Sequence, residues 1–227
     1  MKKTLHFLRH GSALHNINAE PLRAAGCSFQ EFLDQMKVDD AFDAALTPAG
    51  VQQAIAAGSL PPSKAAAASL QLVVTSPLSR AIDTADLVFP ANSEAAPRLM
   101  HESLREITGW LLNGKRRTRS ELSELYPEYD QGNILTDEDV LWKPEELESD
   151  KSVRARANSA IEFIWNRPET TVAVVAHGGL LKNMLCGNPF VRTVTEVGRF
   201  ENCEMKTCTL QWNEGDGVFD VEEIKEE

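Results

Sequence analysis

Three short polar segments of this 227-residue chain carry side chains that could do chemistry, and each directly follows an apolar run. They are Arg9-His10-Gly11, Ser76 to Arg80, and His177-Gly178-Gly179. Together they offer two arginines, two histidines and the glycine-rich start of a helix. Guanidinium groups bind phosphate oxygens with paired hydrogen bonds, and the N–H groups at a helix N-terminus favour an anion. The three segments therefore predict a site for a tetrahedral dianion such as a phosphoryl group.

The apolar runs before these segments are typical of buried strands, and each leads into a helical pattern. They comprise residues 4–8, 70–75 and 170–176, the last rich in β-branched residues, as in a sheet covered on both faces. Strand and helix alternate along the chain, which predicts an α/β fold: a three-layer sandwich with a mostly parallel central sheet between helices. Ligands bind such sheets at the carboxyl ends of the strands, so the three segments should converge.

Residues at the expected helix ends give the boundaries of the other elements. Over 46–60, Thr47 can cap a helix, Pro48 suits its first turn and Gly58 can end it. By the same reasoning, Ser76 should cap a helix that Pro77 opens and that holds Arg80 in its first turn. Residues 61–69 are expected to form a surface connection, and the apolar spacing within 152–166 predicts an amphipathic helix.

We expect one domain over residues 1–227. Residues 108–150, called the insertion below, are polar and interrupted by prolines, which predicts a small cap over the main body with at most two helical stretches. Residues 203–212 and 217–224 are expected to be late strands, antiparallel at an edge of the sheet.

The composition excludes several classes of partner. The net charge of −11 disfavours nucleic acid and anionic membranes, and no segment has the roughly 18 consecutive apolar residues of a membrane span. The four cysteines form no disulfide framework or zinc motif, and no cluster of carboxylates and histidines has metal-ligand spacing. We expect a cytoplasmic protein without a metal or other cofactor that takes a small phosphorylated substrate; the sequence leaves the oligomeric state open.

Five blocks in this order resemble the histidine phosphatase superfamily, in its phosphoglycerate-mutase-like branch. They are "LRHG", "LTPAGVQQA", "TSPLSRAIDTA", "LREITGW" and "VVAHGG", within residues 5–185. One position departs from the phosphoglycerate mutases: Ser12 stands where they usually have glutamate after the first block. The stretches "RHGSALHN", "KRRTRSELSELYPEYD" and "TDEDVLW" resemble a plant and fungal mutase-like subgroup.

The resemblance implies a role for each site residue. His10 would be the nucleophile that forms a phosphohistidine, and Arg9, Arg80 and His177 would stabilise the charge on the phosphoryl oxygens. Asn16 and the backbone at Gly178 would bind the same group. Glu106 would protonate the leaving oxygen and then activate water. From its sequence context Glu106 is favoured over its competitors, Glu102 and the acidic residues 137–139.

The sequence leaves open the role of one basic segment and the exact activity. The basic segment 115–119, with Arg116 and Arg117, is either a solvated surface or the binding site for the rest of an anionic substrate. The activity implied is a metal-independent phosphatase, because Ser12 and the short insertion favour an open site. A cofactor-dependent phosphoglycerate mutase is the alternative, and a non-catalytic phosphate-binding regulator on the same fold is the second.

Overall fold

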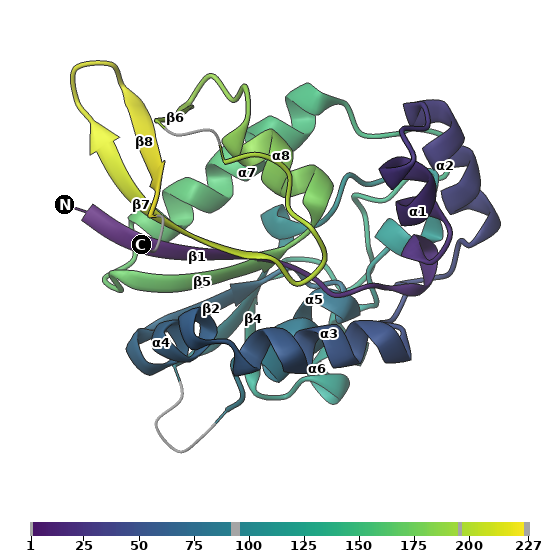
Figure 1. Cartoon of the computed structure of the whole chain (residues 1–227), viewed down its shortest axis with the longest axis horizontal. Helices are drawn as coiled ribbons and strands as arrows, with labels where there is room; N and C mark the ends of the chain where they lie inside the picture. Colours follow the sequence, from purple (N-terminus) through teal and green to yellow (C-terminus); the bar gives the residue numbers. More distant parts are fainter. Residues whose placement is uncertain (1, 92–95, 195–196, 225–227) are drawn as a thin grey trace.

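A computed structural model describes residues 2–91, 96–194 and 197–224. Within them an eight-stranded sheet has the order β4-β3-β2-β5-β1-β7-β8-β6 (Figure 1). The strands are β1 Lys2–Arg9, β2 Leu72–Thr75, β3 Arg98–His101, β4 Tyr129–Asn133, β5 Thr171–Ala176, β6 Val191–Thr193, β7 Met205–Asn213 and β8 Val218–Glu223. The five strands from β4 to β1 are mutually parallel, whereas β7 is antiparallel to both β1 and β8. The expected α/β sandwich with a mostly parallel sheet is confirmed.

Helices cover both faces of this sheet. They are α1 Ala19–Ala24, α2 Phe29–Val38, α3 Pro48–Ser59, α4 Pro61–Ser69, α5 Ser79–Val88, α6 Arg119–Leu125, α7 Asp150–Trp165 and α8 Gly178–Leu185. Helices α7 and α8 lie on one face, and α3, α4 and α5 lie on the other (Figure 1). Helices α1 and α2 lie beyond the end of the sheet toward which β1 runs. Every helix in the described part of the chain is too short or too polar to cross a lipid bilayer.

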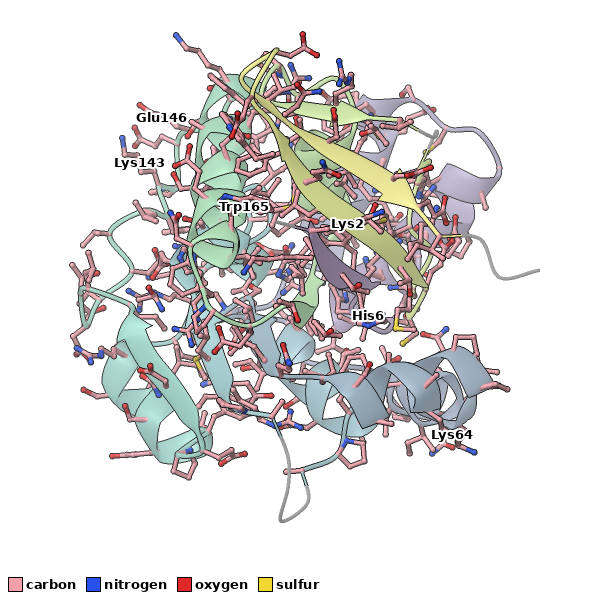
Figure 2. The ribbon with its side chains drawn as sticks, turned by 90° about the vertical axis from the view of Figure 1, so that its left-hand side faces the viewer. Lys2, His6, Lys64, Lys143, Glu146 and Trp165 are labelled. Atoms are coloured by element: carbon pink, nitrogen blue, oxygen red, sulfur yellow. The ribbon has the colours of Figure 1, made fainter. Side chains whose placement is uncertain are left out.

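The insertion contributes to the sheet as well as covering it. Its strand β4 pairs in parallel with β3 at the sheet edge, and α6 is its one α-helix. Farther along, Lys143 and Glu146 form an exposed ion pair on its outer surface (Figure 2). The insertion is therefore partly a continuation of the main body, and its inner residues are held in place by the sheet.

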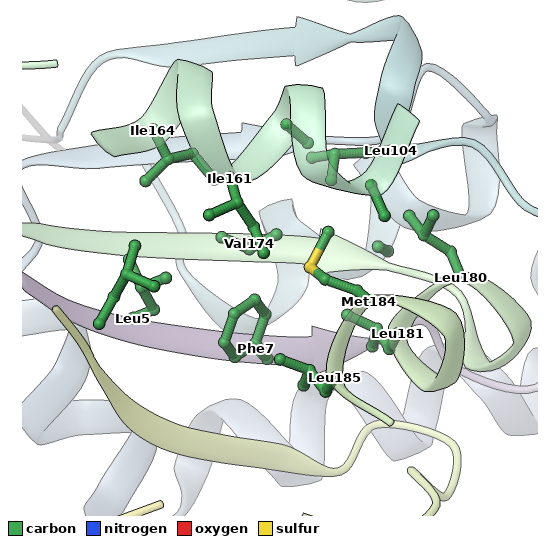
Figure 3. Close-up of a cluster of buried hydrophobic side chains, with 14 of the residues drawn as sticks. Leu5, Phe7, Leu104, Ile161, Ile164, Val174, Leu180, Leu181, Met184 and Leu185 are labelled. Carbon is green, nitrogen blue, oxygen red and sulfur yellow. The ribbon is translucent and has the colours of Figure 1, made fainter. Parts of the chain in front are cut away.

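Strand β5 shows why the core has two halves. Successive side chains of a strand point to opposite faces. Val172 and Val174 therefore pack with α7 and α8, around Ile161 and Met184 (Figure 3), while Val175 packs against α3 and α5. Burying such side chains contributes roughly 1.5–3 kcal/mol each. The amphipathic helix expected within 152–166 is confirmed as α7, which buries Val153, Ala157, Ala160, Ile161 and Ile164.

The parallel register brings the three polar segments to one edge. Arg9 is aligned with Ala176, and Thr75 is aligned with Val175. The residues that follow β1, β2 and β5 are therefore neighbours, although they are far apart in the sequence. The expected convergence is confirmed.

Four local expectations were wrong. Residues 61–69 form helix α4, because two prolines in a first turn open a helix and the alanines after them continue it. Gly58 lies inside α3, which ends at Ser59. Ser76 does not cap α5, whose N-cap is Leu78. The strand near 203–212 is interior, because β7 lies between β1 and β8, and the edge strand on this side of the sheet is β6.

Candidate active site

The backbone at the end of β1 is fixed on every side. The N–H of His10 donates to the carbonyl of Ala176 on β5 (3.0 Å), and the amide of Asn202 donates to the carbonyl of His10 (3.0 Å). The N–H of Gly11 donates to the hydroxyl of Thr84 on α5 (3.1 Å). A Cβ at Gly11 would lie 2.7 Å from the carbonyl oxygen of Gly50, so the chain can turn here only because Gly11 has no side chain. This turn holds His10 in one position.

The His10 imidazole is oriented as a nucleophile would need to be. Its Nδ1 lies 2.7 Å from the carbonyl oxygen of Gly11, which can only accept, so Nδ1 carries the proton and Nε2 keeps its lone pair. The Nε–H of Arg80 donates to this Nε2 (3.3 Å). Burial and the charges of Arg80 and Arg9 hold the pKa of His10 well below 6.5, which keeps the ring neutral.

His177 faces His10 from the end of β5, with ring centroids 4.9 Å apart. Its Nε2 lies 2.8 Å from the hydroxyl oxygen of Ser76, which also accepts the N–H of Leu78. A serine hydroxyl has one hydrogen and two lone pairs, so this contact fits either neutral tautomer of His177. Burial, Arg80 and His10 lower the pKa of His177 well below 6.5. Ser76 thus orients His177, a role that its place before Pro77 did not reveal.

Each of the two expected arginines is anchored by part of its guanidinium group. Arg9 donates through Nη1 to the carbonyl of Phe200 (2.9 Å) and through Nη2 to Glu20 of α1 (2.5 Å). Arg80 donates through Nη1 to the carbonyl of Asn113 in the insertion (2.8 Å). Burial lowers the pKa of Arg80 to about 10, with Asp43 acting in the opposite direction, so it stays charged at neutral pH.

Four buried nitrogens of this cluster have no hydrogen-bond partner within the described residues. They are Nε of Arg9, Nη2 of Arg80, Nδ1 of His177 and Nδ1 of His15. A buried donor left without a partner costs about 1–3 kcal/mol, so such groups are rare unless a ligand satisfies them. His15 is an additional member of the cluster: it is buried, with its ring centroid 6.0 Å from that of His10.

Glu106 lies at the N-terminus of α8, next to this cluster. Its Oε1 accepts the N–H groups of Ile107 (2.9 Å) and Leu180 (3.0 Å), and its Oε2 accepts that of Gly179 (3.1 Å). A Cβ at Gly179 would lie 2.5 Å from Oε1, so a glycine is needed for the carboxylate to approach the helix. Gly178 has a similar role toward Arg9, whose Nε would lie 3.1 Å from an added Cβ.

The competitors of Glu106 are committed elsewhere. Glu102 forms ion pairs with Arg105 (2.9 Å) and Arg116 (3.0 Å), and Asp139 pairs with Arg105 (2.5 Å). Of the acidic residues considered, the structure brings Glu106 alone to the N-terminus of α8, within the part of the chain that it describes.

Asn16 is buried in a short 3-10 helix, Leu14–Asn16, between β1 and α1. Its Oδ1 accepts the N–H of Ala13 (3.1 Å), which leaves the hydrogens of its amide nitrogen to donate. This orientation fits the neutral donor that the sequence predicted.

Arg116 was expected to bind the substrate, but none of its hydrogen-bond donors is free to do so. This buried side chain uses its Nε on the carboxylate of Glu102, and its two Nη groups on the carbonyls of Arg117, Thr136, Asp137 and Glu138. Its five N–H groups are thus all occupied within the protein, so Arg116 holds the insertion together. The sequence showed the charge but not the carbonyls that surround it.

Arg117 is partly exposed and pairs with Asp43, with Nε 3.1 Å from Oδ2. Asp43 is buried, has a left-handed backbone (φ 43°) and accepts hydrogen bonds from the N–H and hydroxyl of Ser79 at the start of α5. The arginine is therefore compensated by a carboxylate that also orders the helix of Arg80. Asp43 and Glu20 carried no signal in the sequence, because their partners lie far along the chain.

The residues 112–114 of the insertion reach the site through Asp40. Its carboxylate accepts the N–H groups of Leu112 (2.8 Å) and Asn113 (2.9 Å), and Asn113 in turn supplies the carbonyl that anchors Arg80. Across the described residues, no group of three or more histidines, cysteines and acidic residues is arranged to hold a metal ion. The cations beside His10 are arginines.

Comparisons with known proteins agree with this geometry. The chain is 33% identical to a phosphoglycerate mutase-like protein of Arabidopsis thaliana, over 92% of this chain and 84% of the relative. It is 29% identical to a probable phosphoglycerate mutase of the fungus Arthroderma benhamiae, over 78% of this chain and 55% of the relative.

Solved structures share the fold. A mycobacterial glucosyl-3-phosphoglycerate phosphatase matches with a TM-score of 0.56 and 22% identity, over 98% of this chain and 96% of that one. A putative α-ribazole-5′-P phosphatase of Escherichia coli matches with a TM-score of 0.58 and 19% identity, over 99% and 96%. The model of the histidine phosphatase superfamily (branch 1) matches residues 5–223. The chain therefore belongs to the histidine phosphatase superfamily, and its curated relatives are phosphoglycerate mutase-like proteins of plants and fungi.

Proposed function

We propose that this protein is a metal-independent phosphatase that hydrolyses a small phosphate monoester through a phosphohistidine at Nε2 of His10. The observation that carries the proposal is the group of four buried nitrogens without partners beside a neutral His10 whose Nε2 is unprotonated and accepts a hydrogen bond from Arg80. A tetrahedral dianion would accept hydrogen bonds from the arginine and histidine donors among them. Guanidinium groups form paired hydrogen bonds with phosphate oxygens, so two of them beside the histidines suit a phosphoryl group.

In the first step the lone pair of Nε2 attacks phosphorus and the bond from phosphorus to the ester oxygen breaks. Arg80 would then turn its N–H groups from Nε2 to the phosphoryl oxygens, which Arg9 and His177 also bind. The donors of Arg9 and His177 are already in place, so Arg80 is the group that reorients as negative charge develops on the phosphoryl oxygens. Glu106, in its protonated form, delivers a proton to the ester oxygen, and the alcohol leaves.

In the second step Glu106, now a carboxylate, takes a proton from water. The oxygen attacks phosphorus, the bond from phosphorus to Nε2 breaks, and its electron pair returns to the imidazole. Inorganic phosphate leaves and the enzyme regains its starting form. Splitting one displacement into two in this way is the general advantage of a covalent intermediate.

A phosphoglycerate mutase is the second candidate, and the printed names of the plant and fungal relatives favour it. It shares the first step and differs in what attacks the phosphohistidine: the product's own hydroxyl replaces water. The position after the first glycine supports hydrolysis, because Ser12 is half-buried and binds Gln53 through its N–H, so no carboxylate stands there.

One experiment decides between them. Phosphate release from 3-phosphoglycerate and 2,3-bisphosphoglycerate is measured beside the interconversion of 2- and 3-phosphoglycerate, under the same conditions. We expect net hydrolysis. Interconversion that outruns phosphate release by orders of magnitude would establish the mutase, and neither reaction on a broad panel of phosphate esters would favour a non-catalytic phosphate-binding protein.

A further inference from the structure

Helix α1 presents one face to the candidate site. Its Glu20 binds Arg9 and also pairs with Arg199 of the segment before β7. This double contact fixes the rotation of the helix about its axis. Residues three apart in a helix lie on the same face, so the side chain at position 23 is directed to the same side as Glu20.

Arg23 occupies that position and is not committed to any partner. Its guanidinium carbon lies 3.6 Å from the ring centroid of Phe32, which is buried with Ala19 and Met36. It forms no ion pair or hydrogen bond with a described residue, and it is partly exposed. The ring of Phe32 packs against the flat face of the guanidinium. The edge of the guanidinium, which carries the N–H donors, remains available to bind a ligand.

The charge of Arg23 influences the pKa of a histidine in the site. It contributes to lowering the pKa of His15, after burial and the charges of Arg80 and Arg9. Its own pKa is lowered by burial, while Glu20 and Glu106 act to raise it. Arg23 is therefore electrostatically coupled both to the histidine cluster and to the candidate acid.

The other arginines considered for substrate binding already have partners or roles of their own. Arg9 and Arg80 hold the phosphoryl position, Arg116 has all its donors occupied, and Arg117 is compensated by Asp43. A second negative group on a substrate would need a cation next to the phosphoryl site whose donors are free. Arg23 lies three residues along α1 from Glu20, which binds Arg9, and it forms no ion pair or hydrogen bond with a described residue.

We propose that Arg23 binds a second anionic group of the substrate, a carboxylate or a second phosphate, next to the phosphoryl group that is transferred. This inference rests on the proposed function. The rest of an anionic substrate would then be bound by α1, and not by the basic segment 115–119. Arg23 makes the protein selective for doubly anionic esters and takes no part in the chemical step.

The test compares 3-phosphoglycerate with glycerol 3-phosphate, two small esters that differ in one carboxylate. In Arg23→Gln we expect kcat/KM for 3-phosphoglycerate to fall about tenfold or more, mainly through KM, because one charged hydrogen-bonded contact is lost. For glycerol 3-phosphate the change should stay within about twofold. Arg23→Lys should restore part of the selectivity, because it keeps the charge but not the planar group.

Lys64→Gln is the matched control, since it removes the same charge from an exposed side chain on the outer side of α4 (Figure 2). It should leave both substrates unchanged. An equal loss on both substrates in Arg23→Gln, or the same loss in Lys64→Gln, would overturn the proposal. If the wild type turns over neither these two esters nor the broad panel of phosphate esters, the proposed function fails by itself. Calorimetric binding of the same two compounds to wild type and Arg23→Gln then still tests Arg23, and equal affinity ratios in the two proteins would refute it.

Discussion

Replacing Gly179 by alanine should separate the position of Glu106 from the stability of the fold. The added Cβ would lie 2.5 Å from Oε1 of Glu106 and 3.0 Å from Cδ1 of Ile107. Ordinary contact begins near 3.4 Å, so one of the partners must move by about 0.9 Å. The backbone of α8 is fixed after β5, whereas the carboxylate ends a flexible side chain. Glu106 is therefore the group that moves.

The size of the effect follows from this displacement. A misplacement of about 1 Å in a catalytic group can cost roughly 10²-fold in rate. We expect kcat/KM of Gly179→Ala to fall by about 10²-fold on an alkyl phosphate, whose leaving oxygen needs a proton. On p-nitrophenyl phosphate, which leaves without help, the loss should be less than about tenfold. Stability should change little, because alanine gains roughly 1 kcal/mol over glycine in a helix while contacts of Glu106 are lost.

The assay measures both substrates for Gly179→Ala, Glu106→Gln and the double variant, with thermal unfolding of each. If Gly179→Ala acts through Glu106, it should add little to Glu106→Gln, because the two changes remove the same function. Gly215→Ala, in the turn between β7 and β8, is the control, since its Cβ would lie 3.4 Å from Oδ1 of Asn213, an ordinary contact. Equal losses on the two substrates, or full additivity in the double variant, would refute the role of Glu106 as proton donor.

Four further outcomes are expected. Rapid quench with labelled substrate should trap acid-labile, base-stable phosphate that His10→Ala abolishes; label that persists in the variant would exclude His10 as nucleophile. Turnover should survive exhaustive chelation with EDTA, and activity that is lost and then returns only with Mg²⁺ or Zn²⁺ would contradict metal independence. The pKa values of His10, His15 and His177 are lowered in the folded protein, so the unfolded chain takes up protons first as the pH falls. Stability should thus be fully present above pH 6.5 and decrease below it by up to about 1.4 kcal/mol per pH unit for each histidine. Urea unfolding between pH 7.5 and 5.5 measures this, and a flat profile would speak against three buried neutral imidazoles. Arg116→Gln should lower the free energy of unfolding by about 3 kcal/mol, because it leaves Glu102 and several carbonyls without their partner, while KM changes less than about twofold. A raised KM at unchanged stability would restore Arg116 as a substrate ligand.

Strand ends and helix faces could be predicted from the sequence because their signals are local. The β-branched run before His177 and the apolar spacing of α7 each lie within one element, and the parallel sheet follows from their alternation. Helix α4 was missed for an equally local reason: Pro61 and Pro62 were interpreted as a connection, whereas at the first positions of a helix they favour it.

The partners of the charged residues could not be predicted in the same way. Glu20 and Asp43 resemble any other surface acid until the fold brings them to Arg9 and Ser79. The sequence context favours Glu106 over Glu102, but it does not give their partners: both follow β3 within a few residues, and the fold brings Glu106 to α8 and Glu102 to Arg116. Long-range electrostatic contacts leave no periodic trace in a sequence.

The hydrogen bond between Arg80 and the carbonyl of Asn113 limits how this enzyme can be re-engineered. An obvious way to change its substrate is to graft the insertion of a related phosphatase onto the main body. Such a graft would also exchange the group that anchors Arg80, and it would leave Asp40 without its two backbone donors. Residues 112–114 and Asp40 should therefore be transplanted as a unit or kept. Diversity is better introduced at exposed side chains of the insertion, such as Lys143 and Glu146.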